Sequence, residues 1–240
     1  MAHFVLIHGA WHGAWCWEEV VPRLEAAGHG VSAPDLPGHG ADPADPAAAT
    51  LDAYAARIVE TLEAAPERSI LVGHSMAGMP ISEAAERAAE RVEALVYVAA
   101  FLPQDGESLM AIEAHNPRST IPPASVPSPD ERTLTIPAEK HRELFFAQVP
   151  AGTMARAQER LGPQAVAPFL GEVRLTPARF GAIPRHYVAC TEDGAISMEL
   201  QRRMIERDPM VRVHELPSDH SPFYSHPEDL AAILIGIADG

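Results

Sequence analysis

Short apolar runs alternate with longer stretches of helical composition in the first hundred residues and again after residue 184. The apolar runs predict strands, at 4–7, 31–33, 69–72, 94–99, 187–190 and 211–216. The stretches between and after them predict helices, at 15–27, 51–65, 76–90, 197–207 and 230–237. This alternation is typical of βαβ units, in which helices cover both faces of a mostly parallel sheet. The pattern therefore predicts an α/β fold.

The pattern changes between residues 103 and 184, where twelve of the chain's 23 prolines lie. This segment has few clear strands, and its amphipathic pieces at 140–148 and 154–160 predict short helices. We interpret 104–184 as a cap inserted into a core formed by 1–103 and 185–240. A chain of 240 residues is long enough to bury one good-sized core, so we expect one domain with an insertion.

Charge and composition exclude several classes of function. The chain has 18 Lys and Arg against 33 Asp and Glu, a net charge of −15, so it lacks the basic surface that nucleic acid requires. The first apolar run breaks at His8-Gly9, too early for a signal peptide or a membrane span, and we expect a cytoplasmic protein without a membrane partner. Cys16 and Cys190 have no metal-ligand spacing and are expected to be buried apolar thiols. We expect no metal or organic cofactor, and a homodimer is the one assembly that we allow for.

A serine stands where the strand at 69–72 gives way to an Ala-rich helix, in the segment Gly73-His74-Ser75-Met76-Ala77-Gly78. Such a strand-to-helix elbow is typical of a hydrolase nucleophile, because it lifts the serine hydroxyl clear of the sheet at a helix N-terminus. The segment departs from the pattern G-x-S-x-G by one methyl group, at Ala77. The alternative is that Ser75 only caps the helix, and the partners described next favour the nucleophile.

An acid and a histidine follow the serine in the chain order that accompanies this elbow. We expect Asp193 to accept a hydrogen bond from Nδ1 of His220, so that Nε2 of the same ring faces Ser75. Glu192 is the alternative acid, whereas Asp219 is expected to form a turn. The remaining histidines of interest are expected to be structural or solvated: His74, His214 and His226.

The loop after the first strand, which begins His8-Gly9-Ala10-Trp11-His12, is expected to complete the site. Hydrolysis of an ester passes through an oxyanion, and the backbone amides of Ala10 and Met76 are the expected donors to it. His12 either contacts the substrate or braces the loop, and we favour bracing. Trp11, Met76 and Phe101, together with the cap, should form an apolar substrate pocket.

Segments from across the core resemble the plant methylesterase and hydroxynitrile lyase family, which has the α/β-hydrolase fold. The segments that carry the resemblance are 8–17, 73–78, 99–103 and 190–193. The salicylic-acid-binding methylesterases are the most similar branch. The resemblance implies Ser75, Asp193 and His220 as the catalytic triad, and the amides of Ala10 and Met76 as oxyanion donors.

Two positions separate the esterase and lyase branches of this family. The lyases typically carry threonine where this chain has Ala10, and lysine after the catalytic histidine, where it has Ser221. Without that ammonium group a departing cyanide lacks its electrostatic partner, so the two positions favour ester hydrolysis over cyanohydrin cleavage. The resemblance as a whole implies a carboxylesterase of bacterial type.

We therefore expect a serine carboxylesterase that hydrolyses small, uncharged, hydrophobic or aromatic carboxylic esters through an acyl-enzyme intermediate. Trp11, His12, Phe101 and Ser221 are the expected substrate contacts. The net charge of −15 further disfavours anionic substrates. The alternatives are a hydroxynitrile lyase that cleaves cyanohydrins and a non-catalytic small-molecule receptor on the same fold.

Overall fold

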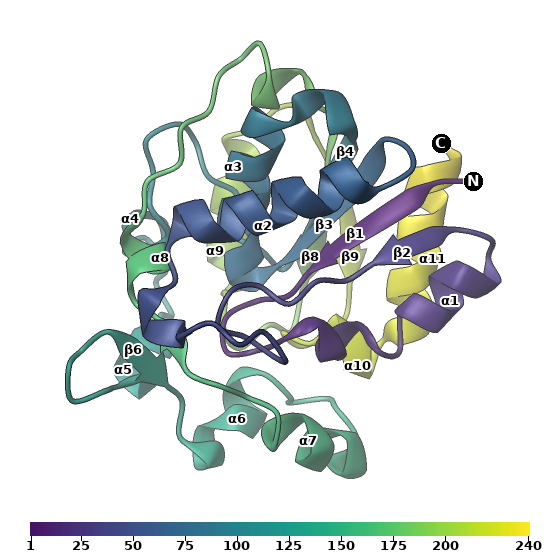
Figure 1. The fold of residues 1–240 in the computed structure, drawn as a ribbon. Helices are drawn as coiled ribbons and strands as arrows, with labels where there is room; N and C mark the ends of the chain where they lie inside the picture. The colour runs from purple at the N-terminus through teal and green to yellow at the C-terminus, as the bar shows by residue number, and fades with distance from the viewer.

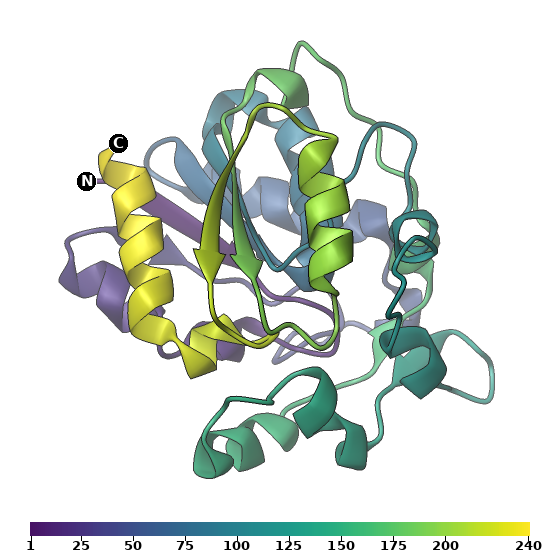
Figure 2. The ribbon, with the colours of Figure 1, turned by 180° about the vertical axis from the view of Figure 1, so that it is seen from behind.

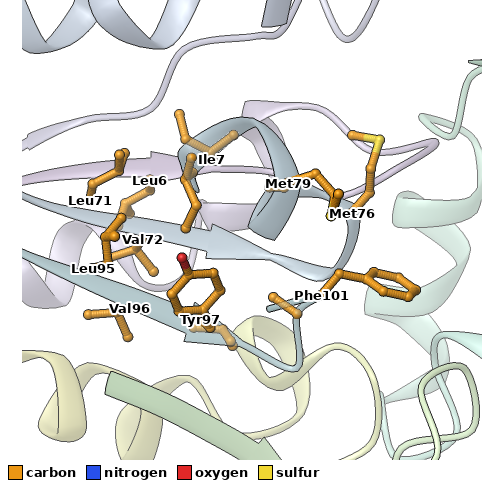
Figure 3. Packing of buried hydrophobic residues seen from close by; sticks show 14 of the residues in the cluster. Leu6, Ile7, Leu71, Val72, Met76, Met79, Leu95, Val96, Tyr97 and Phe101 are labelled. Carbon is orange, nitrogen blue, oxygen red and sulfur yellow. The ribbon is translucent and has the colours of Figure 1, made fainter. Parts of the chain in front are cut away.

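A six-stranded sheet, in which every neighbouring pair of strands is parallel, forms the centre of the computed structural model, which describes residues 1–240. Three strands of this sheet, at 3–7, 69–74 and 185–190, are buried along their whole length, as expected for a sheet covered on both faces. Figure 3 shows apolar side chains packed along the strands at 3–7, 69–74 and 92–98. The predicted α/β fold is confirmed. In spatial order the strands are β2 (Gly30–Ser32), β1 (His3–Ile7), β3 (Ser69–His74), β4 (Val92–Val98), β8 (Arg185–Cys190) and β9 (Val211–Leu216).

Helices cover the sheet, with α2 packed beside α3 on one side and α1 beside α11 on the other (Figures 1 and 2). In α2 the buried residues recur every three or four positions, and the Thr50 hydroxyl caps the first turn by accepting from the Ala53 N–H. The core helices are α1 (Val21–Ala26), α2 (Leu51–Ala64), α3 (Gly78–Arg87), α9 (Met198–Glu206), α10 (Pro222–Ser225) and α11 (Pro227–Asp239).

Some helices differ from the sequence prediction at their ends. The stretch 15–27 is divided into a 3-10 helix at Ala14–Trp17 and α1, whose first turn contains Pro22, because proline suits the first helical positions. The stretch 76–90 is divided as well, since a 3-10 helix at Ser75–Ala77 precedes α3. Helix α11 begins at Pro227, earlier than predicted, and the single turn α10 was not predicted.

The strands β1 and β3 are neighbours in the sheet, but the chain continues from them in opposite directions along it. After β1 the chain crosses to β2, which lies on the far side of β1 from β3. After β3 it crosses to β4, which lies on the far side of β3 from β1. The register pairs Ile7 of β1 with Gly73 of β3, so the two strands end together. Ligand sites of open parallel sheets form at such a switch point, outside the carboxyl ends of the strands. The fold therefore places the segments that follow Ile7 and His74 at a candidate site.

The segment between β4 and β8 covers this end of the molecule, where α5, α6, α7 and β6 lie beyond the ends of the strands (Figures 1 and 2). Its small antiparallel sheet was not predicted, because strands of two or three residues leave little periodic signal. The division into a core and a cap at 104–184 stays a prediction. The elements of this segment are α4 (Leu109–Glu113), α5 (Ile121–Ala124), β5 (Val126–Pro127), β6 (Thr133–Thr135), α6 (Ala138–Leu144), α7 (Ala151–Gln158), β7 (Gln164–Ala165) and α8 (Ala167–Leu170).

Both cysteines are buried free thiols, as the sequence predicted, and burial raises the pKa of the Cys16 and Cys190 side chains. No helix of the structure combines the length and the apolar composition that crossing a bilayer requires. The side chains form no group of three or more His, Cys, Asp or Glu that could hold a metal ion.

Candidate active site

Ser75 occupies a strained turn between β3 and α3. Its φ of 57° lies in the left-handed region, which a residue with a side chain adopts only where the surrounding structure enforces it. Small neighbours make the turn possible. A Cβ atom at Gly73 would lie 2.8 Å from Cδ1 of Ile81, and one at Gly9 would lie 2.9 Å from Cβ of Ser75. The predicted elbow is therefore present, with the β1 loop packed directly against the serine.

The small position that the packing requires is Gly78 rather than Ala77. A Cβ atom at Gly78 would lie 1.8 Å from the backbone oxygen of Phe101, whereas the Ala77 side chain fits, fully buried. The Phe101 segment is held close because its N–H donates a hydrogen bond of 3.0 Å to the Ser75 carbonyl. In Figure 3, Phe101 lies just beyond the carboxyl end of the strands. The departure at Ala77 therefore does not disturb the elbow.

A hydrogen-bonded relay joins the three residues expected to form the triad. Oγ of Ser75 lies 3.0 Å from Nε2 of His220, and Nδ1 of His220 lies 2.8 Å from Oδ2 of Asp193. Because an ionised carboxylate only accepts, Nδ1 carries the proton, and Nε2 is free to accept from the serine hydroxyl. The side chains of His220 and Asp193 are 3% and 0% exposed, so the pair is shielded from water.

The structure distinguishes between the two neighbouring acids. Oδ1 of Asp193 accepts from the N–H groups of Ala195 and Ile196, at 2.7 and 2.9 Å, which fixes the carboxylate while Oδ2 faces His220. Glu192 is exposed, and its backbone N–H donates to the Ser218 carbonyl. Asp193 is therefore the acid in contact with the histidine.

Two further histidines hold the loops of the site in place. His74, which precedes the serine, donates from Nε2 to the backbone oxygen of His220 at 2.7 Å. His8 donates from Nδ1 to the Gly9 carbonyl, and its Nε2 accepts from the Leu36 N–H. Burial lowers the pKa of both rings well below 6.5, so both are neutral at pH 7. His74 thus has the structural role that was expected, because it links the segment that carries Ser75 directly to the segment that carries His220.

The loop after β1 brings Ala10 and His12 to the cavity in front of Ser75. Both residues line this cavity, and the neighbouring Trp11 has a φ of 62°. His12 donates from Nδ1 to the Ala10 carbonyl at 2.8 Å, which is the bracing role that the sequence analysis favoured. Burial lowers the pKa of His12 to about 3, so the ring is neutral and its Nε2 has no partner. Met76, the other expected oxyanion donor, directly follows Ser75 in the 3-10 helix that precedes α3.

The cavity has a volume of about 190 Å³ and a mainly apolar lining. Three of the four predicted substrate contacts, Trp11, His12 and Phe101, belong to this lining, whereas Ser221 does not. Met76, which was expected to help form the pocket, is also absent from the lining, so that expectation is corrected. Ser221 is fully buried in the turn that Asp219 organises, where its N–H donates to Oδ1 of Asp219. The expected contact at Ser221 is therefore corrected. The lining comprises Ala10, Trp11, His12, Ser75, Phe101, Leu109, Met110, Glu113, Ile121, Pro122, Ser125, Leu134, Phe145, Phe169, Ala195, Ile196 and His220.

The sequence predicted that the segment between β4 and β8 would contribute to the pocket, but it did not indicate which residues of the segment line the cavity. The apolar residues among them carry no motif, and only the three-dimensional fold brings them over Ser75. The segment is anchored at the site, because Trp11 donates from Nε1 to the Leu134 carbonyl and the Gln148 N–H donates to Oδ2 of Asp219, at 2.9 and 2.8 Å. Asp219 thus forms a turn, as expected, and also binds this segment to the loop that carries His220.

The chain is similar over nearly its whole length to proteins of one family. A family model described as the alpha/beta hydrolase family matches residues 4–233. Methylesterase 9 of Arabidopsis thaliana is 31% identical, with 100% of this chain and 99% of that protein covered. Salicylic acid-binding protein 2 of Nicotiana tabacum is 34% identical, with 98% and 96% covered. The crystal structure of a pyrethroid hydrolase from Sphingobium faniae has a TM-score of 0.90 at 31% identity, with 100% and 98% covered.

The fold, the site and these relatives define a carboxylic ester hydrolase with the α/β-hydrolase architecture. The chain belongs to the alpha/beta hydrolase family. Its similarity to the methylesterases agrees with the resemblance that the sequence motifs indicated.

Proposed function

We propose that this protein is a serine carboxylesterase that hydrolyses small, uncharged esters with a hydrophobic or aromatic part through an acyl-enzyme. The observation that carries the proposal is the relay from Asp193 through His220 to Ser75, which ends at a largely apolar cavity. The volume of the cavity supports the proposal that the substrate is small. A cavity of roughly 150 Å³ in another protein holds one benzene ring, so about 190 Å³ suits a substrate part with a single ring.

In the proposed mechanism Oγ of Ser75 attacks the ester carbonyl carbon while Nε2 of His220 takes the hydroxyl proton. Asp193 stabilises the imidazolium that forms, and the amides of Ala10 and Met76 bind the oxyanion. His220 then gives its proton to the leaving alcohol, and the acyl group stays on Ser75. Water, deprotonated by the same ring, hydrolyses the acyl-enzyme and regenerates the serine. The segment 104–184, as a cap, would keep the apolar part of the substrate away from water.

Hydrolysis of p-nitrophenyl butyrate by the wild type, Ser75→Ala and Ser125→Ala tests the assignment. Ser125 is a matched control, because it also lines the cavity but donates its hydroxyl to the Ile121 carbonyl instead of a histidine. We expect Ser75→Ala to lose nearly all hydrolysis and Ser125→Ala to retain it. A fluorophosphonate probe should label Ser75, as located by mass spectrometry, and a label on Ser125 would overturn the proposal.

The two alternatives give different results in the same samples. Faster release of cyanide from mandelonitrile than of nitrophenol from esters would favour the hydroxynitrile lyase. Binding of aromatic esters with no hydrolysis and no phosphonate labelling would favour the receptor.

A further inference from the structure

The cavity contains one acidic side chain, and this side chain has no role in the proposed mechanism. Glu113, at the end of α4, is 6% exposed and is the only Asp or Glu in the lining. It takes part in none of the ion pairs of the structure. Burial of a carboxyl group costs free energy unless hydrogen bonds replace its water, so its position in an apolar cavity calls for a function.

The hydrogen bonds of Glu113 serve its two oxygens unequally. Oε1 accepts from the Ser119 hydroxyl at 2.6 Å and from Nδ2 of Asn116 at 3.1 Å. Oε2 has only a contact of 3.3 Å with the same Asn116 nitrogen. Asn116 is itself fixed, because its Oδ1 accepts from the Ser197 hydroxyl at 2.7 Å. The carboxyl group is therefore held rigidly, with one oxygen that lacks a donor of its own.

The surroundings of Glu113 suit an uncharged partner. Burial raises the pKa of Glu113, since removal from water outweighs the hydrogen bonds from Ser119 and Asn116. A carboxylate accepts a hydrogen bond from a hydroxyl group, and a neutral carboxyl group can either donate to it or accept from it. An ammonium group would lose far more hydration free energy than a hydroxyl group on entering a cavity lined mainly by apolar residues.

We propose that Glu113 is a specificity-determining residue that hydrogen-bonds a hydroxyl group on the part of the ester bound beneath 104–184. This proposal rests on the esterase function proposed above and narrows its substrate class. Ser75 and His220 act on the ester group, while Glu113 binds a second polar group of the same substrate. Esters that lack such a group leave the carboxyl oxygen without a partner once water has been displaced.

The test compares methyl phenylacetate with its 2-, 3- and 4-hydroxy derivatives in the wild type, Glu113→Leu and Glu113→Gln. In the wild type we expect kcat/KM for at least one hydroxylated isomer to exceed that of the parent by about tenfold. Glu113→Leu should reduce this preference to less than about twofold and still hydrolyse the parent ester. Glu113→Gln, which keeps a carbonyl acceptor, should lie in between.

Ser119→Ala is the matched control for a purely structural role. It removes the 2.6 Å hydrogen bond to Glu113 and leaves the carboxyl group, and Ser119 does not line the cavity. We expect this variant to keep the preference for the hydroxylated ester. Equal loss of activity on both esters in Ser119→Ala and Glu113→Leu would mean that Glu113 only holds α4 in place, and would overturn the proposal.

The remaining outcomes separate this proposal from the proposed function. If no hydroxylated isomer is preferred, or if Glu113→Leu keeps the preference, the role of Glu113 is refuted while the esterase function stands. If the wild type hydrolyses none of these esters or p-nitrophenyl butyrate, the proposed function itself fails. A preference for methyl 4-(aminomethyl)phenylacetate over all hydroxylated isomers would refute the uncharged partner. If Glu113→Leu does not fold, the ratio in Glu113→Gln decides.

Discussion

Replacement of Gly78 by alanine should disrupt the elbow although it adds a single methyl group. The φ of Gly78 is −54°, which alanine adopts readily, so the effect comes from packing alone. The new Cβ atom would lie 1.8 Å from the Phe101 oxygen, while ordinary contact begins at 3.4 Å. The start of α3 and the Phe101 segment must therefore separate by roughly 1.5 Å, since Gly78 is buried and has no free space beside it.

This separation should affect both stability and catalysis. It stretches the 3.0 Å hydrogen bond between Phe101 and Ser75, and it moves the Met76 amide relative to the serine hydroxyl. Overpacking of this kind costs about 1–3 kcal/mol of the free energy of unfolding. A displacement of about 1 Å in a catalytic group lowers the rate by roughly 100-fold. We expect losses of this size in kcat for p-nitrophenyl butyrate and in stability measured by urea unfolding.

Ala77→Gly is the matched control, because it restores the usual glycine at the neighbouring position of the same turn. It removes a buried methyl group and adds backbone entropy to the unfolded chain, which should cost about 0.5–1 kcal/mol. Its kcat should stay close to that of the wild type. A Gly78→Ala variant as stable and active as the wild type would refute the argument from crowding, as would a larger loss of kcat in Ala77→Gly.

Two further predictions concern charge and protonation. Asp193→Asn should lower kcat by about 10⁴-fold with little change in KM, because the His220 ring would then present the wrong tautomer to Ser75; retention of more than a tenth of the wild-type kcat would contradict this role. Burial lowers the pKa of His12 to about 3 in the folded protein, against about 6.5 when unfolded, so its stabilising contribution is complete above pH 6.5 and is lost as the pH falls towards 3. The free energy of unfolding of the wild type and of His12→Asn can be measured by urea titration between pH 6 and 4. As the pH falls, that of the wild type should decrease by up to about 1.4 kcal/mol per pH unit more than that of the variant. Equal slopes for the two proteins would exclude a buried neutral His12.

The sequence by itself determined the features that short segments encode. An apolar run predicts a strand wherever it lies, so the order of β1, β2, β3, β4, β8 and β9 along the chain could be predicted from the pattern alone. The elbow at Ser75 is equally local, since a serine at a strand end with small residues two positions before and after it suits only a few structures. Chain order, which reflects the topology of the core, indicated His220 as the base and the pair Glu192-Asp193 as the place of the acid.

Only the tertiary structure decided how distant segments meet. Asp193 rather than Glu192 reaches His220, because the N–H groups of Ala195 and Ile196 orient its carboxylate, and sequence order cannot distinguish neighbours. The crowding at Gly78 comes from a backbone oxygen 23 residues away in the chain, and the buried Glu113 belongs to a segment without a motif. Close packing depends on contacts between residues far apart in sequence, and these contacts leave no periodic signal in the chain. The catalytic elements and the apolar character of the cavity were thus predictable from the sequence, whereas the shape of the cavity and its single carboxyl group were not.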